Sequence, residues 1–171
     1  MAVAKKITND TMVQCKNGTH GPLIYDSSRN TVSVEWGEFG EVQDLEYGEL
    51  LIMRGTQPRF FRDNWILIDD ADVLRKLGVE LYYKNSLTSE NFVEVFKWEP
   101  DKIRAEVPKM SDGMKDSIRI RAKELLKDEK LDSRSIIKAF NEVFDCDLEE
   151  ELMLEKKPEK TRKTVETVTI K

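Results

Sequence analysis

The sequence predicts an α+β protein with a small N-terminal β-barrel-like module, SH3-like or OB-like in kind, a C-terminal bundle of short helices and an extended tail. Residues 11–69 form short alternating apolar and polar runs separated by turn signals, which is typical of strands. Residues 86–154 carry apolar positions at helical spacing behind capping residues. Residues 155–171 are dense in charge and poor in apolar residues, so they are expected to stay solvated.

The β module, residues 11–69, follows an N-terminal arm of residues 1–10. Strands are expected at 11–15, 23–25 and 31–36, with a turn at Asn17-Gly18, where both residues tolerate positive φ. Asp44 is then expected to cap a short helix that Gly55 and Pro58 end. A last strand is expected over 60–61 and 65–68. Several short strands with tight turns suit a small, partly open barrel.

Residues 70–85 are predicted to be a connecting helix and hinge. Asp70 is placed to cap a helix that ends at Gly78, where a left-handed glycine belongs. Tyr82 and Tyr83 come directly after it, within an apolar patch. These two tyrosines either dock the helix onto the β module or face a partner.

The helical region, residues 86–154, shows four starts in sequence order. Thr88 or Ser89 is placed to cap the first helix, and Pro100 suits the first position of the second. Ser111 opens the longest helix, and Ser133 precedes a further one. Together these segments predict a small bundle of short helices.

The tail contains an alternating run at 164–170 that is typical of a strand and has no local partner. Such a strand can add to the sheet edge of another chain, although it is also compatible with a chain end that binds nothing. Val165, Val168 and Ile170 in this run join Tyr82 and Tyr83 as the predicted partner-binding residues.

The composition narrows the function classes. The chain has 171 residues and a formal net charge of −5, which argues against broad nucleic-acid binding because displacing counterions requires a basic surface. Cys15 and Cys146 lie far apart, so they predict thiols in a reducing compartment and no zinc site. No apolar run is long enough for a membrane helix, and the first ten residues do not resemble a signal peptide.

No catalytic, metal or cofactor residues are predicted. His20 is the only histidine, and it lies in a loop without a nucleophile motif beside it. Asp69, Asp70 and Asp72 resemble a cation site, but their position before a helix favours capping. Glu35 and Glu38 flank Trp36, a pattern too common to indicate a glycosidase. An enzyme that combines His20 with a carboxylate such as Glu35 remains an alternative.

A second alternative is a nucleic-acid-binding or regulatory module with an OB-like or SH3-like β fold. Arg54, Arg59 and Arg62 cluster in sequence with Phe60 and Phe61, and interleaved basic and aromatic residues are typical of single-strand binding. The acidic balance of the chain instead favours aromatic residues in the core with arginines at the rim.

Four segments together resemble small virion proteins encoded among the structural genes of tailed bacteriophages. They are residues 17–21 (NGTHG), 35–40 (EWGEFG), 45–50 (LEYGEL) and 58–65 (PRFFRDNW). The resemblance covers residues 11–85 and extends more weakly to Phe144. It implies a non-enzymatic role in head, neck or tail assembly, with capsid, portal, neck or tail proteins as partners, and leaves self-association open. It also implies a virion location after assembly in the host cytoplasm, without nucleic-acid or membrane partners.

Overall fold

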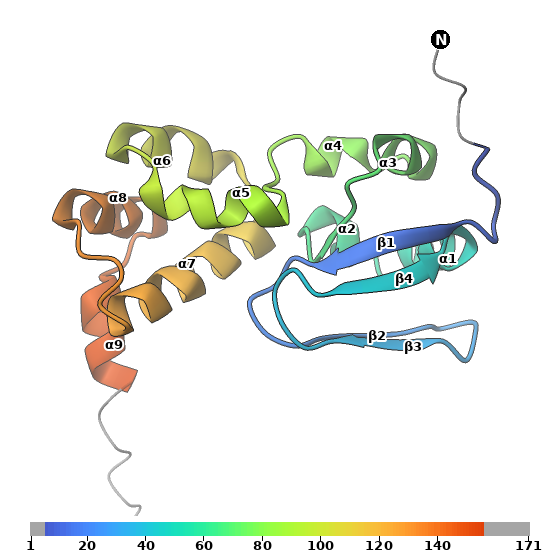
Figure 1. Cartoon of the computed structure of the whole chain (residues 1–171), viewed down its shortest axis with the longest axis horizontal. Helices are drawn as coiled ribbons and strands as arrows, with labels where there is room; N and C mark the ends of the chain where they lie inside the picture. Colours follow the sequence, from blue (N-terminus) through green and yellow to red (C-terminus); the bar gives the residue numbers. More distant parts are fainter. Residues whose placement is uncertain (1–5, 156–171) are drawn as a thin grey trace, which may run out of the picture.

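The structure is a computed structural model that describes residues 6–155, and within that range it is an α+β protein. Four strands come first, two short helices and a fifth strand follow, and the rest of the described chain contains only helices (Figure 1). The strands are β1 (Met12–Asn17), β2 (Leu23–Asp26), β3 (Ser33–Trp36), β4 (Val42–Glu46) and β5 (Ile66–Leu67). The helices are α1 (Tyr47–Thr56), α2 (Arg59–Arg62), α3 (Ala71–Leu77), α4 (Glu80–Tyr83), α5 (Ser89–Glu94), η1 (Val95–Lys97), α6 (Pro100–Glu106), η2 (Val107–Lys109), α7 (Asp112–Lys127), α8 (Arg134–Phe144) and α9 (Leu148–Glu155).

The strands form two small open sheets. β1 lies between β4 and β5 and pairs with both in antiparallel register, with Val13 opposite Leu45 and Lys16 opposite Leu67. β2 and β3 form a separate antiparallel hairpin. No closed barrel forms within residues 6–155, so the barrel-like part of the predicted fold is not confirmed. β5 is only two residues long, which is too short to close the sheet.

Two expected elements of the β module were wrong. Phe60 and Phe61, expected in the last strand, lie in α2, because Pro58 has φ of −61° and so starts a helical turn. Both rings are still buried, as core aromatic residues would be. Asp44, expected to cap the first helix, lies in β4, and α1 begins three residues later at Tyr47.

Most of the predicted helix ends are confirmed. The Asp70 carboxylate accepts hydrogen bonds from the backbone of Asp72 and Val73 at 3.0 and 3.1 Å. Gly78 ends α3 in the left-handed region, with φ of 69°. The side chains of Thr88 and Ser111 cap α5 and α7. Ser133 stands at the start of α8, but its side chain makes no capping bond.

Buried apolar residues form two clusters. One joins the strands to α1, α2 and α3 around Trp36, whose Nε1 donates to the Cys15 carbonyl at 2.9 Å. The other joins α5 to α9 around Phe140. Tyr83 packs against both clusters, so α4 lies where they meet. No helix within residues 6–155 is both long and apolar enough to cross a membrane.

A buried carboxylate fastens the β2–β3 hairpin to α1. Glu49 of α1 accepts hydrogen bonds from Tyr25 Oη at 2.6 Å and Asn30 Nδ2 at 2.7 Å. Burial raises the pKa of the Glu49 carboxyl, but hydrogen bonds from Ser27, Tyr25 and Asn30 outweigh burial and lower the pKa below its ordinary value of 4.5. A lowered folded pKa means that ionised Glu49 stabilises the fold above that ordinary value, and that this stabilisation is lost as pH falls through the folded pKa.

We expect Glu49→Gln to lower the free energy of unfolding at pH 7 by about 1–3 kcal/mol, because Tyr25 and Asn30 donate to different oxygens and one of these becomes an NH2 donor in Gln. The variant is also expected to lose stability less steeply than the wild type as the pH is lowered below about 5. Urea unfolding at several pH values measures both effects. Glu46→Gln changes an exposed carboxylate on β4 and serves as the control. Equal stability of Glu49→Gln and wild type at pH 7 would contradict the role given to Glu49.

Candidate protein-binding surface on α4

The most exposed large apolar side chain in the described chain lies on α4. Leu81 is 80% exposed, and the neighbouring Tyr82 is 46% exposed. A four-residue helix does not hold its shape alone, because the first hydrogen-bonded turn is costly to form. The orientation of these two side chains therefore depends on contacts from the rest of the fold.

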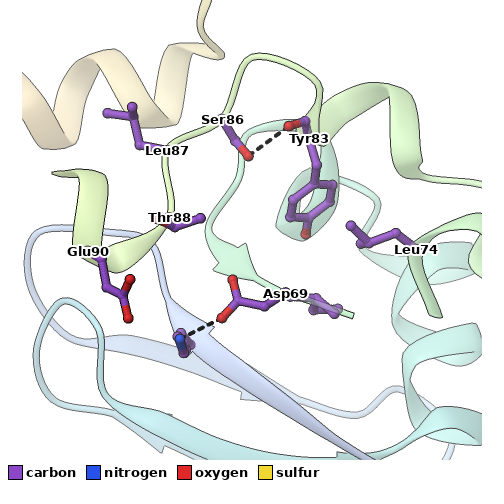
Figure 2. A pocket seen from close by; sticks show the side chains of 9 residues that line it. Asp69, Leu74, Tyr83, Ser86, Leu87, Thr88 and Glu90 are labelled. Atoms are coloured by element: carbon purple, nitrogen blue, oxygen red, sulfur yellow. Dashed lines mark hydrogen bonds and ion pairs between the residues drawn. The ribbon is translucent and has the colours of Figure 1, made fainter. Parts of the chain in front are cut away.

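Tyr83 provides the first of these contacts. Its hydroxyl donates to the Ile66 carbonyl of β5 at 2.8 Å. The Ser86 hydroxyl donates to the Tyr83 carbonyl at 3.0 Å (Figure 2). Burial holds the pKa of Tyr83 well above its ordinary value, so the hydroxyl remains a donor. Of the two tyrosines singled out in the sequence, Tyr83 docks the helix and Tyr82 faces outward.

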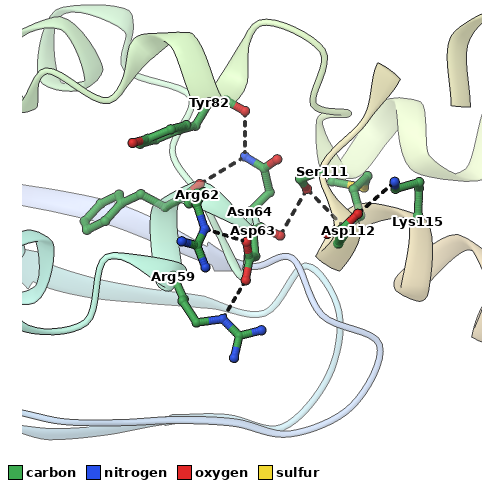
Figure 3. A network of polar contacts seen from close by, with 10 residues as sticks. Arg59, Arg62, Asp63, Asn64, Tyr82, Ser111, Asp112 and Lys115 are labelled. Atoms are coloured by element: carbon green, nitrogen blue, oxygen red, sulfur yellow. Dashed lines mark hydrogen bonds and ion pairs between the residues drawn. The ribbon is translucent and has the colours of Figure 1, made fainter. Parts of the chain in front are cut away.

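Asn64 provides the second contact. Its side chain is buried, and Nδ2 donates to the Tyr82 carbonyl at 3.2 Å (Figure 3). Its Oδ1 atom is buried and has no hydrogen-bond partner among residues 6–155. Asn64 also has φ of 53°, a left-handed conformation that asparagine tolerates better than most residues. The strained and partly unsatisfied Asn64 is thus held in place by its surroundings and in turn holds α4.

The surroundings of Asn64 come from both halves of the chain. Asp63 accepts hydrogen bonds from Arg59 Nε at 2.8 Å and Arg62 Nε at 3.1 Å on the α2 side (Figure 3). On the α7 side, the Ser111 hydroxyl donates to the Asp63 carbonyl at 3.1 Å. The position of α4 therefore depends on the junction between the β module and α7.

At two glycines the backbones of the β module and α7 come into close contact across this junction. Gly18 N donates to the Trp65 carbonyl at 2.7 Å, and the Ser117 hydroxyl of α7 donates to the Gly18 carbonyl at 2.9 Å. Gly113 lies in the first turn of α7 against the Asp63 carbonyl. Gly18 does not have positive φ, so the reason for glycine is close approach and not the turn conformation expected from the sequence.

A cavity of about 330 Å³ lies beside α4, between the β module and the start of α5 (Figure 2). Tyr83, Leu74 and Leu87 form an apolar part of its wall. Lys16 and Asp69, whose Nζ and Oδ2 atoms are 2.6 Å apart, form a charged part. The volume lies near the lower end of the range for ligand pockets, and the cavity is lined from the Tyr83 side of α4, without Leu81 or Tyr82.

His20 makes a contact that the sequence did not predict. Its Nε2 atom lies 2.7 Å from Glu124 Oε1 of α7. Burial raises the pKa of Glu124, but hydrogen bonds from His20 and Arg121 outweigh it and lower that pKa. Cys15 does not complete a reactive pair, because burial raises the pKa of its thiol to about 12. His20 therefore links the β1–β2 loop to α7, and Glu35 is exposed on β3.

The three aspartates at residues 69–72, before and within α3, each make a different contact. Asp70 caps the helix, Asp69 contacts Lys16, and Asp72 lies 3.0 Å from Arg75 Nη1. No group of three or more His, Cys, Asp or Glu side chains is placed to hold a metal ion within residues 6–155.

The structure separates the arginines and phenylalanines that cluster at residues 54–62 of the sequence. Phe60 and Phe61 are buried, so their faces are not open to a base. The Arg59 guanidinium lies 4.6 Å from the centre of the Trp65 ring, while Arg54 donates to the Leu77 carbonyl at the end of α3. The sequence favoured aromatic residues in the core with arginines at the rim, and the positions of these side chains agree with that interpretation.

The predicted partner-binding residues Val165, Val168 and Ile170, with the rest of the tail beyond Glu155, lie outside the described residues. Glu155 itself, assigned to the tail from the sequence, is the last residue of α9. Comparisons of the chain with models of known protein families, with curated proteins and with solved structures found no match.

Proposed function

We propose that this chain is a non-enzymatic structural or assembly protein of a tailed bacteriophage particle, and that it binds a capsid, portal, neck or tail protein through α4. The observation that carries the proposal is the exposure of Leu81 and Tyr82 on a helix fixed from behind by Tyr83 and Asn64. Neighbouring exposed apolar side chains indicate an interaction site.

The fixed position of α4 favours binding energetically. A side chain that is already ordered loses little conformational entropy when it is buried by a partner. Tyrosine is enriched in protein interfaces because it combines a large apolar ring with a polar hydroxyl. Leu81 and Tyr82 thus have the properties of a small binding anchor.

The phage assignment rests on the resemblance of residues 11–85 to small virion proteins. The SH3-like or OB-like class of the β module stays a prediction, since the described sheets are open. Addition of the alternating run at 164–170 to a neighbouring sheet also stays a prediction. Both belong to the same proposal, because two linked contacts bind a repeating shell or tube more tightly than either contact alone.

Nucleic-acid binding is the second candidate, and one contact favours it. Arg59 and Arg62 are both exposed on α2, and the Arg59 guanidinium lies over the Trp65 ring. Binding of single-stranded DNA through these groups would weaken steeply as salt is raised. Absence of measurable binding at low salt would remove this candidate.

Mass spectrometry of purified particles tests the proposal. We expect the chain in the particle, with its copy number measured against the major capsid protein. On the order of hundreds of copies would indicate a shell or decoration protein, and about a dozen a neck, portal or tail component, since such parts follow particle symmetry. Absence of the chain from intact particles would contradict the proposal.

A further inference from the structure

A groove runs between α5 and α7, and no residue of α4 lines it. It consists of two adjoining hollows of about 150 and 260 Å³ that share Phe92, Val93 and Arg121. Phe92 is buried in its floor, while Val93 is 58% exposed at its edge. The groove is lined by Phe92, Val93, Phe96, Leu125, Leu131, Phe39 and, at its rim, polar residues. We call this surface the α5–α7 groove.

The rim next to the more apolar hollow is basic. Lys97, Arg121 and Lys130 line it, and no carboxylate does. Each cation contacts a carboxylate on its own segment, as Lys97 contacts Glu94 at 3.1 Å and Lys130 contacts Asp128 at 3.3 Å. Exposed pairs of this kind contribute little to stability, so the cations can exchange these contacts for a carboxylate on a docked segment.

The outer face of α9 has the complementary character. Met153 is 67% exposed and Leu154 is 57% exposed, and the exposed Glu149 and Glu150 lie one turn before them. The inner face of α9 packs against the rest of the fold, since Leu148 is buried and Glu151 contacts Arg119 and Lys123 of α7. The outer face of α9 therefore combines two apolar side chains and two carboxylates without a described contact to the rest of residues 6–155.

The two surfaces also match in spacing. Glu149 precedes Met153 by four residues, or about 6 Å along a helix. Val93 precedes Lys97 by the same four residues on α5 and η1. An α9 helix laid antiparallel in the groove would place Met153 against Val93 and Glu149 near Lys97.

The α9 helix cannot occupy the groove of its own copy, because it packs on the opposite face of α7. It contacts α7 at Arg119 and Lys123, whereas the groove contacts α7 at Arg121 and Leu125. Positions two residues apart on a helix are separated by about 200°, so these are opposite faces. An α9 helix that occupies the groove must therefore come from another copy.

We propose that the outer face of α9 from one copy docks in the α5–α7 groove of the next copy. The two surfaces are different, so the contact is heterologous, and its repetition builds a ring or an open filament. The inference goes beyond the proposed function, since α4 takes no part in the contact and self-association is measured without a particle. A contact of four side chains is small, so the association is expected to be weak.

Sedimentation velocity of the purified full chain over a range of concentrations tests the inference. We expect oligomers to appear as the concentration rises towards about 1 mM. Val93→Asp, which alters the groove, and Met153→Asp/Leu154→Asp, which alters α9, are each expected to weaken self-association at least about tenfold. Ile24→Asp is the control, because it makes the same kind of change at a residue that is 57% exposed on β2, and it should leave self-association unchanged.

Mixing the two altered chains distinguishes a head-to-tail contact from a symmetric one. The Val93→Asp chain keeps an intact α9, and the Met153→Asp/Leu154→Asp chain keeps an intact groove. An equal mixture is therefore expected to form dimers with about the affinity of the wild-type contact, and no larger species. A wild-type chain that stays monomeric at about 1 mM would overturn the inference. A mixture that forms no dimers would overturn it as well.

Discussion

Gly113→Ala is expected to destabilise the protein by about 3 kcal/mol, although alanine normally stabilises a helix relative to glycine. A Cβ atom at position 113 would lie 2.1 Å from the Asp63 carbonyl oxygen and 3.0 Å from Trp65 Cδ1. The nearest obstacle is backbone and cannot rotate away, so α7 must move off residues 63–65. That movement lengthens the hydrogen bond from Ser111 to Asp63. It also weakens the contacts through which residues 63–65 hold α4 in place.

Gly55→Ala is the matched control, because Gly55 also lies in a helix and nothing stands within 4 Å of a Cβ built there. We expect this variant to gain about 0.5–1 kcal/mol from the lower backbone entropy of its unfolded state. Thermal and urea unfolding measure both changes. Two glycine-to-alanine changes of opposite sign would establish the close approach at Gly113, whereas a stable Gly113→Ala protein would contradict it.

Leu81→Asp/Tyr82→Asp is expected to reduce incorporation into particles at least about tenfold while leaving the fold intact. Both side chains point away from the core, so two carboxylates there cost little in stability. In a partner interface the same carboxylates would be buried without a counter-charge, which is strongly unfavourable. The measurement is the ratio of variant to wild-type peptides in particles assembled while both chains are expressed.

The control for this ratio is Ile24→Asp, which replaces another exposed apolar residue, 57% exposed on β2. We expect that variant to enter particles as well as the wild type does. Equal incorporation of the α4 variant and the wild type would show that α4 does not bind the particle, even if the chain is present there.

The sequence predicted the helix ends well because each depends on neighbouring residues. Asp70, Thr88 and Ser111 accept hydrogen bonds from backbone amides two or three residues ahead, and Gly78 supplies a left-handed turn at its own position. β4 was missed because Leu45 is the one buried residue among its five and because its pairing with β1 joins residues about thirty positions apart. α2 was mistaken for a strand because two adjacent phenylalanines do not reveal a helical period in four residues.

The candidate surface was predicted only in part. The sequence singled out Tyr82 and Tyr83 but left their roles open, because which tyrosine faces the core depends on how α4 is placed against β5. The long-range contacts that hold α4 in place could not be predicted. Gly18 lies against the Asn64 carbonyl and Gly113 against the Asp63 carbonyl, and His20 contacts Glu124 on α7, but no pattern near these residues in the sequence indicates contacts over such separations.

Photo-crosslinking from α4 inside assembled particles tests the central claim most directly. Tyr82→p-benzoyl-L-phenylalanine places a photoreactive ring at the exposed face, and the same replacement at Ile24 is the control. Irradiation of purified particles is expected to join the chain through position 82 to a capsid, portal, neck or tail protein, with much less product from position 24. Particles that contain the chain but give no such product from position 82 would contradict the account of α4.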